Sequence, residues 1–264
     1  MSSGNKRKFG QCRLCQDDGR LCLSHVYPKF LIKMAKGDDE TLHRFSRSPE
    51  YSYTQLVQDF GKEHMLCSAC EQKLGVWEKY AKEVLFDHEF PWVDYEGCYQ
   101  IQVDYRLFKL FQLSILWRMA AAQAAPFQSV QLSPRVFEEI RTALLSESSI
   151  APDYFGCILL SMPRTGIAAT IPDQFITMPR VSTLGQYAMC NFILGRHIWL
   201  YMLTEVCEEN LPMMLQPNGT LRVMVKESAA GVIYESEVLD AVVGDPALYQ
   251  RHVQKLEKKY SRKL

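Results

Sequence analysis

Apolar residues recur at different spacings along the chain, and the change of spacing separates a helical middle from a β-rich second half. Over residues 71–86 they return every three or four positions, which predicts a helix with one buried face. Residues 104–125 are apolar almost throughout and predict a long buried helix, and a Ser-Pro start predicts another helix over 133–145. From residue 153 onward, β-branched and aromatic segments separated by Pro, Gly or Asn predict the strands of a mainly antiparallel sheet.

The first 90 residues contain few continuous apolar segments. Residues 1–11 predict a basic arm without regular structure, residues 20–27 a short strand, and residues 30–36 one or two helical turns. Residues 37–53 are polar and rich in turn-forming residues, which predicts an irregular loop. A segment with so small a core needs another source of stability.

The composition is that of an ordinary globular protein, with 264 residues, 47% of them hydrophobic, and 30 Lys and Arg against 30 Asp and Glu. No run of 18 apolar residues occurs. The most apolar stretch, residues 107–125, is interrupted by Lys109, Gln112, Arg118 and Gln123 and therefore predicts a buried helix instead of a membrane span. Since the basic N-terminal residues include no apolar signal region, we expect a cytoplasmic protein that is not associated with a membrane.

The distribution of charge is more informative than its zero total. Residues 1–36 carry a balance of +6 and residues 249–264 a balance of +5, which leaves −11 for residues 37–248. If the two ends meet in space, they form one basic surface suited to the phosphates of a nucleic acid. The alternative is two separate solubilising tails.

Four of the nine cysteines form two C-x-x-C pairs, Cys12 with Cys15 and Cys67 with Cys70. In a chain without a signal region, such pairs bind metal more often than they form disulfides. Two pairs can complete a tetrahedral four-sulfur site, so we predict a structural Zn²⁺ on these residues that stabilises the N-terminal segment. The alternative is two unrelated reduced pairs. Cys22 is close enough in sequence to be a further ligand, although its apolar neighbours favour a place in a strand.

These patterns together predict an α+β protein of two domains. Residues 1–90 form a zinc-bound module. Residues 91–264 form a domain with a helical segment, a mainly antiparallel β segment and a basic C-terminal helix over 246–264.

The order of features in the first module is a C-x-x-C pair, a strand ending in His25-x-x-Pro28, a loop, a second C-x-x-C pair and a helix. This order resembles the HNH endonuclease family, whose ββα-metal fold often has zinc knuckles on either side of a strand that ends in His-x-x-Pro. The resemblance covers residues 10–87, roughly a third of the chain. It implies a ββα HNH-like module in which His25 is the general base that activates water for phosphodiester hydrolysis.

The sequence departs from this family at the ligands of the catalytic metal. Ser24 precedes His25, where many members have Asp or His, and Glu71 follows the second pair, where members have histidine. Glu71 is a suitable oxygen ligand for a catalytic Mg²⁺ or Mn²⁺, and Glu78 lies seven residues later on the same helical face. In the alternative interpretation, Glu71 is a favourable carboxylate in the first turn of a helix and Glu78 is a solvated surface residue. His64 is either a substitute ligand or a surface residue.

Two cations are also candidates for phosphate contacts. Lys29 directly follows the His-x-x-Pro turn and is placed to bind a nucleic-acid phosphate, although a lysine at a helix start is commonly only solvated. Arg118 lies inside the apolar helix, so its charge requires a partner. That partner is either a phosphate or, as we favour, an internal carboxylate from Asp104, Glu138 or Glu139.

The segment over residues 105–118 resembles poorly characterised bacterial proteins that carry an HNH-like zinc module at the N-terminus, some of them in anti-phage defence settings. These resemblances imply a metal-dependent HNH-like endonuclease that acts on DNA, in antiviral defence and with a protein partner in a defence complex. The alternative is a non-catalytic zinc-binding module with a degenerate HNH site that binds nucleic acid or a protein. Both share one predicted fold, and a fold does not decide between them.

Overall fold

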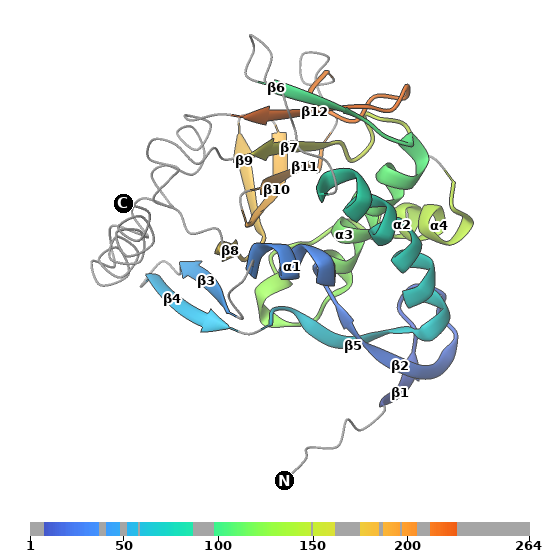
Figure 1. Ribbon diagram of the computed structural model, residues 1–264. Coiled ribbons are helices and arrows are strands. Elements are labelled where there is room, and N and C mark those ends of the chain that lie inside the picture. Colours follow the sequence, from blue (N-terminus) through green and yellow to red (C-terminus); the bar gives the residue numbers. More distant parts are fainter. Residues whose placement is uncertain are drawn as a thin grey trace.

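The computed structural model describes ten stretches of the chain and is drawn in Figure 1. The described residues are 8–36, 41–47, 52–57, 59–86, 98–148, 150–161, 175–184, 187–195, 197–204 and 212–225. They form two β-sheets and four α-helices, which confirms the predicted α+β class. Among the described helices, none combines the length and the apolar character needed to cross a membrane.

A small antiparallel sheet contains strands β1 (Lys8–Gln11), β2 (Asp18–His25) and β5 (Lys62–Cys67), with β2 in the centre. The helix α2 (Ser68–Phe86) begins directly where β5 ends, and α1 (Lys29–Lys36) follows β2 after a short turn. The strand β5 contains a bulge at Met65, because Cys22 lies opposite Leu66 whereas the next residue, Leu23, lies opposite His64.

The large sheet has nine strands among the described residues. Its strands follow the order β4 (Ser52–Val57), β3 (Leu42–Arg47), β8 (Phe175–Thr177), β10 (Tyr187–Leu194), β11 (His197–Met202), β7 (Cys157–Ser161), β12 (Thr220–Val225) and β6 (Cys98–Gln102), and β9 (Arg180–Leu184) also pairs with β10. Most pairs are antiparallel, as predicted, but β3 with β8 and β12 with β7 are parallel.

The helix α3 (Tyr105–Ala121) lies at the centre of the molecule, between the large sheet and the helices α2 and α4 (Pro134–Ser146), and a short 3-10 helix, η1 (Ala125–Phe127), follows it (Figure 1). Asp104 accepts a hydrogen bond from the Leu107 N–H, and Ser133 accepts one from the Val136 N–H, so each side chain caps the helix that follows it. The Tyr201 hydroxyl of β11 donates to the Gln112 carbonyl at 3.0 Å, which fixes α3 against the sheet.

One hydrophobic core joins the described parts of both predicted domains. It includes Trp77 of α2, Trp117 of α3 and Trp199 of β11. The ring of Tyr27, just after β2, stacks on that of Phe192 of β10 with centroids 4.6 Å apart. The chain that leaves the small sheet therefore packs against the large sheet two residues after His25.

Two predictions for the N-terminal segment are wrong. Residues 37–53 were predicted to be an irregular loop, yet β3 and β4 form a hairpin there, and residues 8–11 of the predicted arm form β1. Each of these strands is short and polar, and its stability comes from pairing: β3 pairs with β8, which lies more than 100 residues away in the sequence. The predicted C-terminal helix over 246–264 lies outside the described residues, and the boundary at residue 90 stays a prediction.

Candidate metal centre and the histidine beside it

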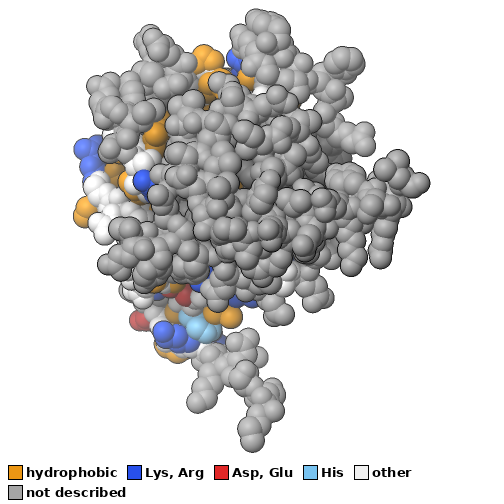
Figure 2. Space-filling model, turned by 90° about the vertical axis from the view of Figure 1, so that its left-hand side faces the viewer, with side chains coloured by type: hydrophobic (Ala, Val, Ile, Leu, Met, Phe, Trp, Pro, Cys, Tyr) orange, Lys and Arg blue, Asp and Glu red, His pale blue; other side chains and the backbone are white. Residues whose placement is uncertain are grey.

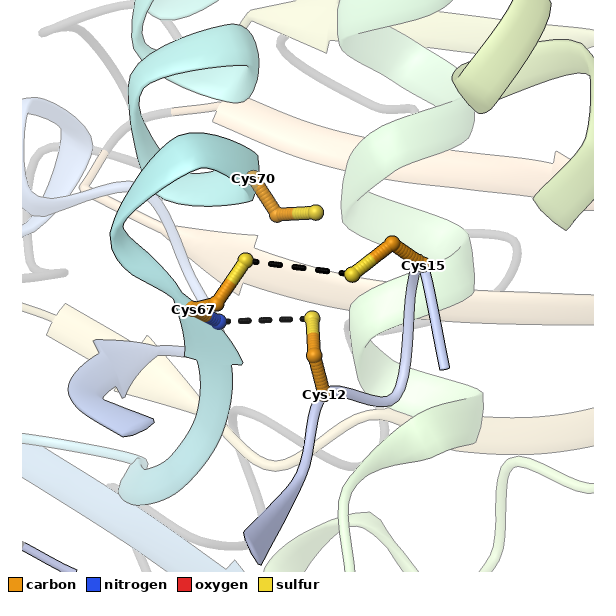
Figure 3. A group of neighbouring side chains, drawn as sticks. All are labelled: Cys12, Cys15, Cys67 and Cys70. Atoms are coloured by element: carbon orange, nitrogen blue, oxygen red, sulfur yellow. Dashed lines mark hydrogen bonds between the residues drawn. The ribbon is translucent and has the colours of Figure 1, made fainter. Parts of the chain in front are cut away.

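The four cysteines of the two C-x-x-C pairs converge on one point. Figure 3 shows their sulfur atoms turned toward a common centre, with Cys12 and Cys15 on the turn after β1 and Cys67 and Cys70 where β5 runs into α2. All four sulfurs lie within 4.8 Å of one another, and those of Cys15 and Cys67 are 3.8 Å apart. The structure thus confirms the predicted shared group.

Backbone hydrogen bonds hold the first pair in place. The Cys12 N–H donates to the Asp17 carbonyl at 2.9 Å, and the Gln16 N–H donates to the Cys12 carbonyl at 2.8 Å, which closes the turn from residue 12 to residue 17. Gln16 takes a φ of 68° in this turn, a left-handed conformation that costs free energy for a residue other than glycine. The Arg13 N–H donates to the carbonyl of the bulge residue Met65 at 3.0 Å, so the turn is fastened to β5.

The geometry fits a tetrahedral metal ion. Thiolates about 2.3 Å from a zinc ion lie about 3.8 Å from one another, which is the separation found between Cys15 and Cys67. The Cys67 N–H donates to the Cys12 sulfur at 3.3 Å, a bond that favours the thiolate form of Cys12. The eight described cysteines are all free thiols, and Cys22 is not a member of the group.

The pKa values of Cys12, Cys15 and Cys70 are shifted in different directions. Burial acts to raise the pKa of Cys12, but hydrogen bonds from the backbone of Cys67, Cys15 and Leu14 outweigh it, and the pKa lies below the ordinary value. Burial raises the pKa of Cys15 to about 11 and that of Cys70 further still. A divalent cation would stabilise this arrangement, because it would replace the protons that thiols of raised pKa otherwise retain.

His25 is the last residue of β2, and its imidazole contacts a carboxylate. Its Nε2 lies 3.3 Å from Oδ1 of Asp59, and Lys62 forms an ion pair with the other oxygen of Asp59. Burial lowers the pKa of His25; the Asp59 charge opposes this shift, and the charges of Lys62 and Lys29 add to it. The imidazole is therefore neutral at pH 7 and held by Asp59.

Glu71 lies on the other side of β2 from His25. Consecutive residues of a strand point to opposite faces, and the Ser24 hydroxyl acts on Glu71, which places Glu71 on the face opposite to His25. Burial raises the pKa of Glu71, although Ser24 and the charge of Arg118 oppose the shift. Among the described residues, the four cysteines are the one group of three or more Cys, His, Asp or Glu side chains close enough to hold a metal. No such group among the described residues contains both His25 and Glu71.

Arg118 pairs with an internal carboxylate, as favoured from the sequence, but its partner is Glu78 and not one of the three expected residues. The Arg118 guanidinium donates to the Glu78 carboxylate at 2.7 Å and to the His25 carbonyl at 3.2 Å. Glu78 is therefore neither a solvated residue nor a free metal ligand. The three expected partners of Arg118 are engaged elsewhere: Asp104 caps α3, Glu138 pairs with Arg141, and Glu139 pairs with Arg135.

Lys29, the first residue of α1, is exposed, and its charge acts on His25. Sequence reasoning missed Asp59 and Lys62, which lie in a loop and at a strand start with no motif of their own. Their spacing of three residues is a weak signal for an ion pair and gives no link to His25. His64 is bonded through Nδ1 to the Leu21 carbonyl at 3.2 Å, on the strand pair and not at the cysteine group.

Searches of family models, curated proteins and solved structures find no match to this chain.

Proposed function

We propose that this chain is a zinc protein whose metal is held by Cys12, Cys15, Cys67 and Cys70. The observation that carries the proposal is the convergence of four sulfurs from two distant segments at tetrahedral spacing. The ion would join the turn after β1 to the start of α2 and so add a link to the core that this segment shares with the rest of the described chain. Its role is structural, because four thiolates leave no position for a substrate or water.

We further propose that the zinc-stabilised module is HNH-like and that the protein acts on DNA as an endonuclease, with His25 as general base. Asp59 supports this role, since a carboxylate that accepts the Nε2 proton leaves Nδ1 unprotonated and able to take a proton from water. The lowered pKa of His25 keeps the imidazole in the basic form at neutral pH. Lys29 and Lys62 supply positive charge beside it for a phosphate.

The catalytic Mg²⁺ or Mn²⁺ that the resemblance implies does not fit the predicted ligands. Glu71 lies across β2 from His25, and Glu78 is bound to Arg118. In this proposal the groups that act on the phosphate belong to the chain itself.

A non-catalytic zinc module with a degenerate HNH site is the second candidate. The Arg118–Glu78 ion pair favours it, because a carboxylate neutralised by a buried guanidinium serves stability instead of metal binding. In this case the protein would bind DNA or a protein partner without cleaving it. A place in antiviral defence is a proposal that rests on the resemblance of residues 105–118 alone.

One experiment separates the two candidates. The zinc-loaded protein, its His25→Ala variant and its Lys79→Gln variant, which alters an exposed helix position, are incubated with supercoiled plasmid, and nicking is followed on gels with and without added Mg²⁺ or Mn²⁺. The endonuclease proposal expects nicking by the wild type and Lys79→Gln and none by His25→Ala at equal zinc content. Absence of nicking by the wild type under all conditions, or equal nicking by His25→Ala, would favour the non-catalytic module.

A further inference from the structure

Near Ser24, where β2 pairs with β5, the small sheet has one face toward the helices and one face toward solvent. Because side chains alternate along a strand and paired residues share a face, the register assigns each residue to one of them. The solvent side, termed here the outer sheet face, carries Lys8 of β1, Leu21, Leu23 and His25 of β2, and Lys62 and His64 of β5. The inner face carries Ser24, Glu63 and Leu66.

Contacts at Ser24 and Glu63 agree with this division, whereas Phe9 and Arg20, which share the register of the inner face, are exposed at the β1 end of the sheet. Ser24 is buried and accepts from the Leu66 N–H, and Glu63 pairs with Arg13 and accepts from the Gln123 N–H at the end of α3. On the outer sheet face, Lys8 and Lys62 are exposed, and Leu23 is 42% exposed although it lies in the central strand. Figure 2 shows a histidine with basic, acidic and hydrophobic side chains around it toward the lower end of the molecule.

The outer sheet face holds no carboxylate in its three strands. The strand carboxylates, Asp18 of β2 and Glu63 of β5, have the register of the inner face. Asp59, in the loop before β5, contacts His25 and Lys62 of this face. The exposed residues of this face are therefore Lys8, Lys62 and Leu23, whereas His25 and His64 are partly buried.

The dimensions of this face suit a polyanion. From Leu21, opposite Lys8, to His25, opposite Lys62, β2 rises by about 13 Å. That distance corresponds to the axial rise of about four base pairs of a DNA duplex. The zinc group lies at one end of the sheet, where it would hold β1 and β5 in fixed relation, and His25 lies at the other end.

We propose that the outer sheet face binds the sugar-phosphate backbone of DNA, with Lys8 and Lys62 on phosphates and Leu23 against the sugars, and leads it to His25. The choice of DNA rests on the proposed function, whereas the surface itself rests on the register, the exposure and the charge. An exposed leucine between cations offers an apolar contact to deoxyribose where a purely hydrophilic face would offer only charge.

The test uses the zinc-loaded full chain and fluorescein-labelled 20-nucleotide DNA, single-stranded and as a duplex, with binding followed by anisotropy over a series of salt concentrations. Leu23→Glu places a carboxylate in the centre of the face and is expected to weaken binding about tenfold or more. The matched control is Val76→Glu, which places the same charge at a 61% exposed apolar position of α2 and is expected to bind as the wild type does.

A second variant, Lys8→Gln, guards against misfolding of Leu23→Glu and is expected to lower the slope of log K against log salt by about one, as the loss of one phosphate contact does. Equal weakening by Leu23→Glu and Val76→Glu, an unchanged slope in Lys8→Gln, or no binding by the wild type would overturn the proposal. Binding that depends on Leu23 in a protein that does not nick plasmid would overturn the endonuclease and leave the DNA surface standing. Plasmid nicking at the wild-type level by both Leu23→Glu and Lys8→Gln would overturn the DNA surface and leave the endonuclease standing.

Discussion

The guanidinium of Arg118 on α3 and the carboxylate of Glu78 on α2 form an ion pair of 2.7 Å in which the arginine side chain is only 3% exposed. The same guanidinium donates to the His25 carbonyl and, through Nε, to the Ser114 carbonyl at 3.2 Å. Two helices and the end of β2 therefore meet at one buried cation.

Removal of one member of this pair leaves a buried charge without its partner. We expect Arg118→Met to lower the free energy of unfolding by about 3 kcal/mol, measured by urea denaturation. Replacement of both members, Arg118→Met with Glu78→Leu, should recover part of that loss. Arg135→Met breaks an ion pair whose arginine is 85% exposed and should leave stability unchanged. Equal losses in Arg118→Met and Arg135→Met would contradict the role assigned to the buried pair.

Metal content should depend on the four cysteines of the group and not on their neighbour. We expect Cys67→Ser to lose the bound zinc and to melt at a lower temperature, since one ligand of four is gone. Cys22→Ser alters a half-buried thiol of β2 outside the group and should retain one zinc per chain. The measurement is elemental analysis of the purified proteins. Retention of zinc by Cys67→Ser would show that the ion is bound elsewhere.

The pKa of His25 should respond in opposite directions to its two neighbours. The Asp59 charge raises this pKa, so Asp59→Asn should lower it further below the ordinary value. The Lys62 charge lowers it, so Lys62→Gln should raise it. Imidazole signals followed by NMR over pH 4 to 8 provide the measurement, and if His25 is the general base, the acid limb of nicking activity should move with them. Shifts of the same sign in both variants would mean that Asp59 and Lys62 do not act on His25 through charge.

Because of Lys109, we expect the free energy of unfolding to be larger in mildly alkaline solution than at neutral pH. Its ammonium is buried and donates to the carbonyls of Pro152, Tyr154 and Phe155 at 2.8 to 3.4 Å, and burial lowers its pKa from 10.5 to about 8. Between these values the unfolded chain binds the proton and the folded chain does not. The free energy of unfolding should therefore rise by up to about 3 kcal/mol as the pH increases from 8 to 10.5. Urea denaturation of the wild type and of Lys109→Met tests this, and the difference between them should grow with pH in that interval; a constant difference would contradict it.

Gly61 lies where no side chain fits. Its φ is 68°, and an added Cβ would lie 2.7 Å from the ring of Phe127, while its carbonyl accepts from the Val26 N–H at 2.8 Å beside His25. We expect Gly61→Ala to lower the free energy of unfolding by about 2 kcal/mol. Gly75 lies in the middle of α2, and nothing lies within 4 Å of a Cβ added there. Gly75→Ala should therefore raise the free energy of unfolding by about 1 kcal/mol. Thermal melts distinguish the two, and similar effects would contradict the steric argument.

The sequence by itself determined the features that depend on local pattern. The helix spacing over 71–86 and the Ser-Pro start at 133 each correspond to a helix of the structure, and the two C-x-x-C pairs named all four members of the cysteine group. These predictions succeed because a helix face, a cap and a thiol pair are each encoded within a few residues.

Only the tertiary structure decided which distant residues meet. The hairpin of β3 and β4 exists because β8 pairs with it, and Asp59 joins His25 because a loop folds back on the end of β2. Arg118 selects Glu78 because α2 and α3 pack together, whereas the partners expected for it satisfy nearer groups. Pairings between residues far apart in the sequence depend on how whole helices and strands pack. The sequence alone therefore does not distinguish among several candidate partners, and the fold decides which of them comes into contact.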